Sequence, residues 1–99
     1  MDYEAMRADL VNAGVRAGTT EAFVSAVRET DALQLAILRA AQRGEPQMTT
    51  MLRDDFDKSR HKLDEAIAEI MVQSAEVGTK VRAICQGDGL LPSPSLEPS

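Results

Sequence analysis

Apolar residues recur at three- and four-residue steps through most of the chain, a spacing that lines up side chains on one face of an α-helix. In the first half, this pattern predicts a helix over residues 20–43, with Thr19 and Thr20 as candidate caps at its start. In the second half, the same spacing predicts one long helix over residues 46–85. No alternation with a period of two competes with it, so the pattern predicts an all-α fold.

Gly44 and Pro46 indicate a turn between the two predicted helices. Glycine suits the position just after a helix, where a positive φ is favoured, and proline suits the first turn of the next helix. Because the connection is short, we expect the two helices to run antiparallel as a helical hairpin.

The two ends of the chain differ from this central hairpin. Residues 1–18 form an amphipathic segment in which Gly14 and Gly18 weaken helix continuity, so we expect a break before the first long helix. Residues 86–99 hold three of the four prolines together with glycine and serine, a composition typical of a flexible, disordered tail. A chain of 99 residues is long enough for one domain, which we place at residues 1–85.

Composition excludes several classes of function. The formal net charge is −5 and no run of Lys or Arg offsets it, which disfavours nucleic-acid binding. No stretch approaches the roughly 20 apolar residues that a membrane-spanning helix needs. The acidic start, Met1 to Glu4, lacks the basic and apolar regions of a signal peptide, so we expect the protein to be cytoplasmic at synthesis.

Few side chains are suited to catalysis or metal binding. His61 lies between Asp57 and Glu65 at four-residue spacing, but zinc normally takes further His or Cys ligands, so we interpret the three as a solvated helix face. Cys85 is the only cysteine, and we expect it to act as a small apolar residue near a helix end. On one straight helix it would lie about 36 Å from His61, too far for a catalytic pair. We therefore predict no catalytic residue, cofactor or metal.

Apolar residues outside the facing stripes of the hairpin predict association. Two antiparallel helices bury one stripe each, which leaves other apolar side chains uncovered: Val24, Leu35, Leu38, Met51 and Met71. A dimer that forms a four-helix bundle would cover them. The alternative is a compact three-helix monomer in which the N-terminal segment supplies the missing wall.

The predicted second helix resembles a known family, the small WXG-type (early secreted antigen-like) proteins of type VII secretion. The segment from Phe56 to Ile70, followed by Ser74-Ala75-Glu76-Val77-Gly78, is similar to the family's aromatic-Asp, Leu, Ala-Leu and Ser-Glu-x-Gly pattern. His61-x-x-x-Glu65-x-x-Ala68 approximates a polar motif that members carry there. The resemblance covers about residues 20–85.

The chain departs from the family at two motifs. The naming motif, Trp-x-Gly, would fall on Gln42-Arg43-Gly44, where the Gly is present and the Trp is absent. The tyrosine export signal that should follow the second helix is also missing, because the only Tyr is Tyr3. Members that pair as heterodimers can divide these signals between partners, so the resemblance is compatible with a partner subunit.

The resemblance implies a non-enzymatic helical hairpin that is a type VII-like secretion substrate, or its dimerisation partner, exported as a folded dimer without a cleavable signal peptide. The partner would be a second copy, a similar hairpin or a component of the secretion machine. The implied interface is apolar: Leu52, Phe56, Leu63, Ile67, Ile70 and Val77. We place Val81 of the second helix and Phe23, Val27 and Leu38 of the first in the same interface.

Two other functions stay open. One is a cytoplasmic adaptor or chaperone of another secretion or assembly machine, which would hold a partner helix in an apolar groove. The other is a small helical-bundle enzyme that binds an anionic substrate through Arg28, Arg39 or Arg53.

Overall fold

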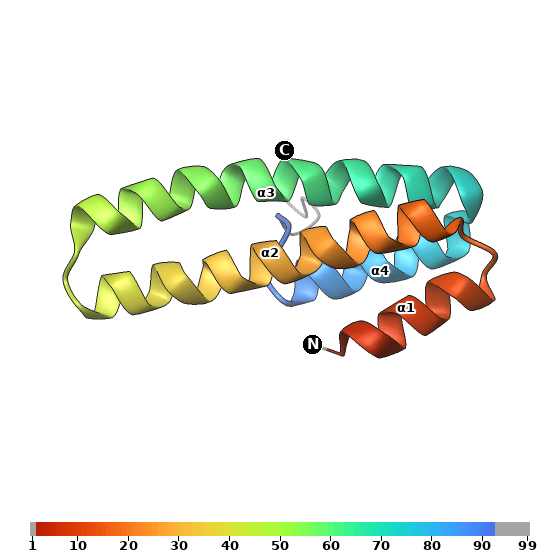
Figure 1. Cartoon of the computed structure of the whole chain (residues 1–99), viewed down its shortest axis with the longest axis horizontal. Helices are drawn as coiled ribbons and strands as arrows, with labels where there is room; N and C mark the ends of the chain where they lie inside the picture. The colour runs from red at the N-terminus through yellow and green to blue at the C-terminus, as the bar shows by residue number, and fades with distance from the viewer. Residues whose placement is uncertain (1, 93–99) are drawn as a thin grey trace, which may run out of the picture.

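The computed structural model describes residues 2–92, which form four α-helices and no strand. The helices are α1 (Tyr3–Asn12), α2 (Ala17–Gln42), α3 (Pro46–Gln73) and α4 (Ala75–Gly87), as Figure 1 shows. The prediction of an all-α fold is therefore confirmed for this part of the chain.

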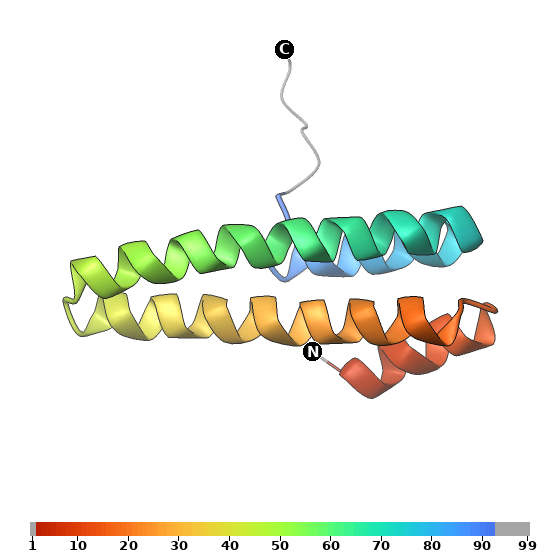
Figure 2. The ribbon, with the colours of Figure 1, turned by 45° about the horizontal axis from the view of Figure 1, so that its top comes forward.

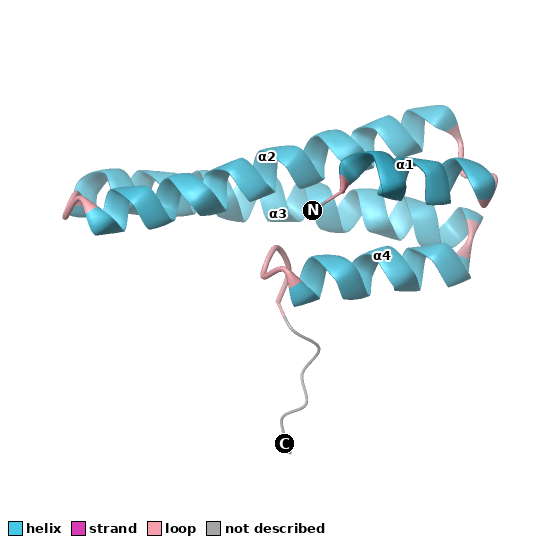
Figure 3. Cartoon of the chain, turned by 90° about the horizontal axis from the view of Figure 1, so that it is seen from below, coloured by secondary structure: helices cyan, strands magenta, loops and turns pink. Residues whose placement is uncertain are grey.

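The two long helices, α2 and α3, lie side by side and run in opposite directions (Figures 1 and 2). α1 folds back beside α2, α4 folds back beside α3, and α1 also contacts α4. Figure 3 shows that all four helices pack together at one end, whereas α2 and α3 lie alone at the other. We call these the four-helix end and the tip, and we define the tip as residues 33–56.

A sharp corner at Ser74 divides the predicted second helix, so the prediction of one helix over residues 46–85 is wrong. Ser74 has extended backbone angles, φ −155° and ψ 101°, that neither helix can continue through. Its side-chain Oγ accepts a hydrogen bond from the backbone N–H of Val77 at 3.4 Å. Ser74 therefore ends α3 and serves as the N-cap of α4.

The corner also depends on Gly78, where α4 passes very close to α3. A Cβ added to Gly78 would lie 2.9 Å from the backbone Cα of Met71 and would also clash with Cγ of that residue. Only glycine lacks this atom. The absence of a side chain at this position lets α4 return along α3.

The turn at the tip joins α2 to α3. Gly44 adopts φ +69°, and its backbone N–H donates to the carbonyl of Ala41. Pro46 is the first residue of α3, where its missing N–H removes no helical hydrogen bond. These two residues set the antiparallel course of α2 and α3.

α2 begins at Ala17, earlier than the sequence pattern predicts, and Thr19 and Thr20 lie inside it and do not cap it. The backbone N–H of Arg16 donates to Oε1 of Gln73 at 2.7 Å, and Nε2 of Gln73 donates to Oγ1 of Thr19 at 2.9 Å. The last residue of α3 thus supplies the polar partner that the start of α2 needs.

The flexible tail predicted for residues 86–99 begins too early, because residues 86–91 belong to the folded part of the chain. α4 continues to Gly87, and after Gly89 the backbone N–H of Leu90 donates to the carbonyl of Cys85 at 2.9 Å. This is the usual hydrogen bond of a helix that ends at glycine, and it places the next apolar residue against the last turn. Leu90 and Leu91 are buried in the core. The rest of the predicted tail, residues 93–99, lies outside the described residues.

The core fills the four-helix end and is built mainly from aliphatic side chains, contributed by all four helices, by the α1–α2 connection and by the segment after α4. Its buried members are Met6, Leu10, Val15, Phe23, Val24, Ala26, Val27, Leu63, Ala66, Ile67, Ile70, Val77, Val81, Cys85, Leu90 and Leu91. The hydroxyls of Thr30 and Ser59 are buried between α2 and α3 and bond to each other at 2.7 Å. The pair satisfies both polar groups where the core gives way to the tip.

Replacement of Gly78 by alanine tests the corner. The added methyl meets the α3 backbone at Met71, so Gly78→Ala should lower the free energy of unfolding by about 1–3 kcal/mol. Urea denaturation followed by circular dichroism measures this change. Gly18→Ala is the matched control, because a Cβ at Gly18 meets no atom within 4 Å and should leave stability unchanged or slightly raised. Equal stability of the two variants would contradict the close approach.

Candidate interaction surface

Most of the predicted dimer interface is buried inside a single chain. Seven of its residues belong to the core of the four-helix end: Phe23, Val27, Leu63, Ile67, Ile70, Val77 and Val81. The same core takes in Met6 and Leu10 of α1, Cys85 of α4, and Leu90 and Leu91 after α4. In this fold these seven residues present no surface to a partner.

The other three predicted interface residues lie at the tip. Leu38 is 55% exposed, and Leu52 and Phe56 are half-buried. They remain uncovered because α1 and α4 do not reach them. The hydroxyl of Tyr3, at the start of α1, donates to Asp31 at 2.8 Å, and the turn after α4 reaches Gln34, whose Nε2 donates to the carbonyl of Gly89 at 3.4 Å.

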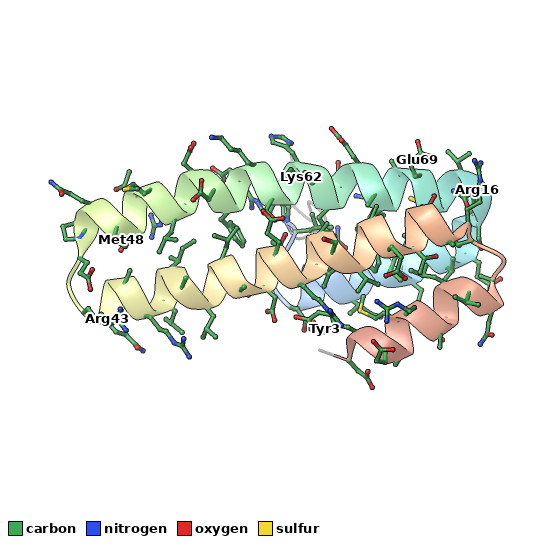
Figure 4. The ribbon with its side chains drawn as sticks, in the orientation of Figure 1. Tyr3, Arg16, Arg43, Met48, Lys62 and Glu69 are labelled. Atoms are coloured by element: carbon green, nitrogen blue, oxygen red, sulfur yellow. The ribbon has the colours of Figure 1, made fainter. Side chains whose placement is uncertain are left out.

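Large exposed apolar side chains gather at the tip. Leu35 is 48% exposed, Met48 45% and Met51 64%, in addition to Leu38. Figure 4 shows Met48 near the start of α3, at the opposite end of the molecule from Arg16. Within residues 2–92, only Val11 and Val72 are comparably exposed outside the tip. The tip therefore carries four of the six large exposed apolar side chains in the part of the chain that the structure describes. Met51 is on the row of α3 that holds Asp55, Lys58 and Lys62, a different face from that of Leu35 and Leu38.

A shallow pocket of about 340 Å³ marks the boundary between the tip and the four-helix end. Its walls come from α2, α3 and the turn after α4: Gln34, Ile37, Arg53, Phe56, Asp57 and Gly89. Ile37 and Phe56 extend the apolar stripe of the core onto the tip. The pocket thus opens where the covered part of the α2–α3 pair becomes uncovered.

A larger depression, of about 700 Å³, lies between α2 and α3 nearer the four-helix end. Small residues such as Ala22, Ser25 and Ala66 line it, with Lys62 and Glu69 among the charged residues beside them. Figure 4 places Lys62 and Glu69 on α3. Because alanine and serine carry little apolar surface, contact here would gain less hydrophobic free energy than contact with the leucines and methionines of the tip.

The return of α4 changes the placement of His61 and Cys85. Because α4 runs back beside α3, Gln86 and His61 line the same pocket, so the distance predicted for one straight helix does not apply. Cys85 itself is fully buried in the core, while His61 is exposed. No group of three or more His, Cys, Asp or Glu residues within the described chain is arranged to hold a metal ion.

The arginines considered for an anionic substrate do not form one site. The guanidinium of Arg28 lies 5.1 Å from the centre of the Tyr3 ring and 3.7 Å from a carboxylate oxygen of Glu4, on the side of α2 that α1 covers. Arg53 lines the tip pocket, and Arg39 lies on the exposed surface of α2.

No family model, curated protein or solved structure matches the chain. Between residues 2 and 92, none of the helices has the length and apolar character to cross a membrane.

The buried thiol of Cys85 should be inert in the folded protein. Burial, with a smaller contribution from the carboxylate of Asp88, raises its pKa to about 12. At pH 8 a thiol-specific disulfide reagent should react with the unfolded chain and leave the folded protein unmodified on the same timescale, because only the thiolate is the nucleophile. Reaction of the folded protein at the unfolded rate would show that Cys85 is accessible.

The same pKa predicts a loss of stability at alkaline pH. Above the ordinary thiol pKa of about 8.5, the unfolded chain releases a proton that the folded chain retains. The free energy of unfolding should therefore be insensitive to this group below pH 8 and should fall between about pH 9 and pH 12. A Cys85→Ala variant lacks this term, so its stability should decline less than that of the parent over the same range. Parallel declines in urea denaturation would contradict the assignment.

Proposed function

We propose that this chain is a non-enzymatic helical protein that acts by binding another helical chain at its tip. The observation that carries the proposal is the uncovered apolar surface of Leu35 and Leu38, on the side of α2 where α1 and the turn after α4 lie but beyond their reach. A partner helix laid across the tip would bury these side chains in the way that α1 and α4 bury the core stripe at the other end.

The size of this surface limits the kind of complex. Leu35 and Leu38 are each about half exposed, so their burial would contribute about 1 kcal/mol each, or about 2 kcal/mol in total. The loss of translational and rotational freedom on association costs about 4–15 kcal/mol. The exposed side chains alone are therefore too few for a tight complex, and the partner must gain further contacts along α2 and α3.

We place this activity in a type VII-like secretion system, with the chain as a substrate or as the dimerisation partner of one. The support is the resemblance over residues 20–85, together with two long helices of opposite direction joined at Gly44. The Ser-Glu-x-Gly part of the resemblance falls on the corner, where Ser74 caps α4 and Gly78 permits its close approach to α3. An adaptor or chaperone of another assembly machine would use the same surface.

Two substitutions at the tip test the binding activity. Replacing both Leu35 and Leu38 by glutamine removes apolar surface and keeps a similar helix propensity. A neutral 20-residue peptide that forms a helix with leucines on one face should bind the wild-type protein measurably by fluorescence anisotropy and at least tenfold more weakly to the double variant. Val72→Gln is the matched control, since Val72 is 81% exposed at the four-helix end. No binding to the wild type, or equal loss in both variants, would contradict the proposal.

Export tests the secretion context separately. We expect the full-length protein to accumulate in the culture medium of its native host when the type VII machinery is intact, and to stay with the cells when an ATPase gene of that machinery is deleted. Quantitative immunoblotting of medium and cell fractions, with a cytoplasmic enzyme as the lysis control, measures the difference. Retention in the cells of both strains would favour the adaptor or chaperone over a secreted substrate.

A further inference from the structure

We propose that the partner at the tip is an acidic amphipathic helix of a different protein, lying on the face of the α2–α3 pair that α1 and α4 cover at the other end. This inference rests on the proposed function and specifies the chemistry of the partner. Its basis is two arginines beside the uncovered apolar stripe, Arg39 and Arg53, together with the ion pair by which Arg28 of α2 binds Glu4 of α1.

The uncovered apolar stripe, to which Leu35 and Leu38 belong, lies on the face of the α2–α3 pair that α1 and α4 cover at the four-helix end. Gln34 contacts the turn after α4, and Leu38 follows it by four residues. Asp31 holds Tyr3 of α1, and Leu35 follows it by four residues. Residues four apart on an α-helix share a face, so Leu35 and Leu38 extend the surfaces on which the two short helices lie.

α2 already binds an acidic side chain through an arginine on this face. Glu4 of α1 lies 3.7 Å from Arg28 of α2, and the ring of Tyr3 lies under the same guanidinium. Arg39 follows Arg28 by eleven residues, or about three helical turns, and therefore lies along the same edge of α2. It has no acidic partner among residues 2–92.

Arg53 of α3, like Arg39 of α2, lies beside the apolar surface of the tip. It lines the tip pocket beside Ile37 and Phe56, and it too has no ion-pair partner within the described chain. Of the nearby carboxylates, Asp54 pairs with Lys58 at 3.1 Å, and Asp57, which lines the same pocket as Arg53, pairs with Arg60 at 2.9 Å. Asp55 lines a different pocket, together with Lys58 and Lys62. The apolar stripe of the tip is thus bordered by Arg39 on α2 and Arg53 on α3, which a helix with flanking glutamates or aspartates would complement.

The same charges disfavour a second copy of this chain at the tip. A symmetric contact brings the same surface of two copies together, so Arg39 and Arg53 of both copies would gather at one interface. Like charges at an interface oppose association. A different, acidic chain has no such penalty.

A peptide pair with opposite charges tests the inference on the full-length protein. Both peptides have 20 residues and the same leucine face; one carries flanking glutamates and the other flanking lysines. We expect the wild type to bind the acidic peptide about tenfold more tightly than the basic one at low salt, with the difference shrinking as salt is raised. The Arg39→Glu/Arg53→Glu double variant should reverse this preference.

Arg16→Glu is the matched control, because Arg16 is exposed at the opposite end of the molecule (Figure 4) and should leave the preference unchanged. If the wild type binds acidic, neutral and basic peptides equally, the acidic partner is refuted and the apolar binding site stands. If none binds, the proposed function fails as well. A concentration-dependent dimer in sedimentation velocity, lost in Leu35→Gln/Leu38→Gln, would overturn the inference in favour of a second copy.

Discussion

The close passage of α4 over α3 is the contact on which the rest of the structure depends. At Ser74 the backbone leaves the helix, and at Gly78 the returning helix lies so near Met71 that a side chain cannot fit between them. Through this contact Val77, Val81 and Cys85 reach the core of their own chain. Without the reversal these side chains would continue outward along a straight helix, and the stripe of α3 that they cover would need a partner.

The lengths of the helices explain why the chain covers itself only in part. α2 and α3 have 26 and 28 residues, whereas α1 and α4 have 10 and 13. At a rise of about 1.5 Å per residue, the long pair is about 40 Å long and the short helices are about 15–20 Å. Since both short helices begin or end at the same end of the molecule, about half of the long pair has no cover. The exposed apolar residues of the tip follow from this difference in length.

The sequence was sufficient to predict the helical class and the turn at the tip, because these depend on local preferences. Gly44 and Pro46 favour a turn in any helical context, and the structure has one there. The corner was missed for a physical reason. Ile70, Val77 and Val81 keep helical spacing across the break, so the apolar period is the same for one straight helix as for two helices that share a core. The available signals were Ser74 as an N-cap residue and the unusual length of the predicted helix.

The segment after α4 also shows that composition alone does not predict which residues enter the core. Gly89 and the nearby prolines correctly indicate that the helix stops, but they do not reveal that Leu90 and Leu91 turn back into the core. A hydrophobic residue directly after a C-terminal glycine is part of a common helix ending, and that pairing carries more information than the proline content. The N-terminal segment had the opposite outcome. The sequence allows this segment to form a wall of the core, and in the structure Met6 and Leu10 of α1 have this role.

The missed corner also explains why the predicted interface and the candidate interface differ. Both start from the same premise, that two antiparallel helices cannot bury all their apolar residues. With one straight second helix, the uncovered residues would extend along the whole hairpin, and a symmetric dimer would be the simplest way to cover them. Once α4 returns, the chain buries the central stripe, and the uncovered part shrinks to the tip. There Leu35 and Leu38 lie beside Arg39, which has no ion-pair partner among residues 2–92. A small apolar surface beside charged side chains is better suited to recognising a complementary partner than to building an obligate bundle, because charges contribute mainly to specificity and a small area contributes little to affinity.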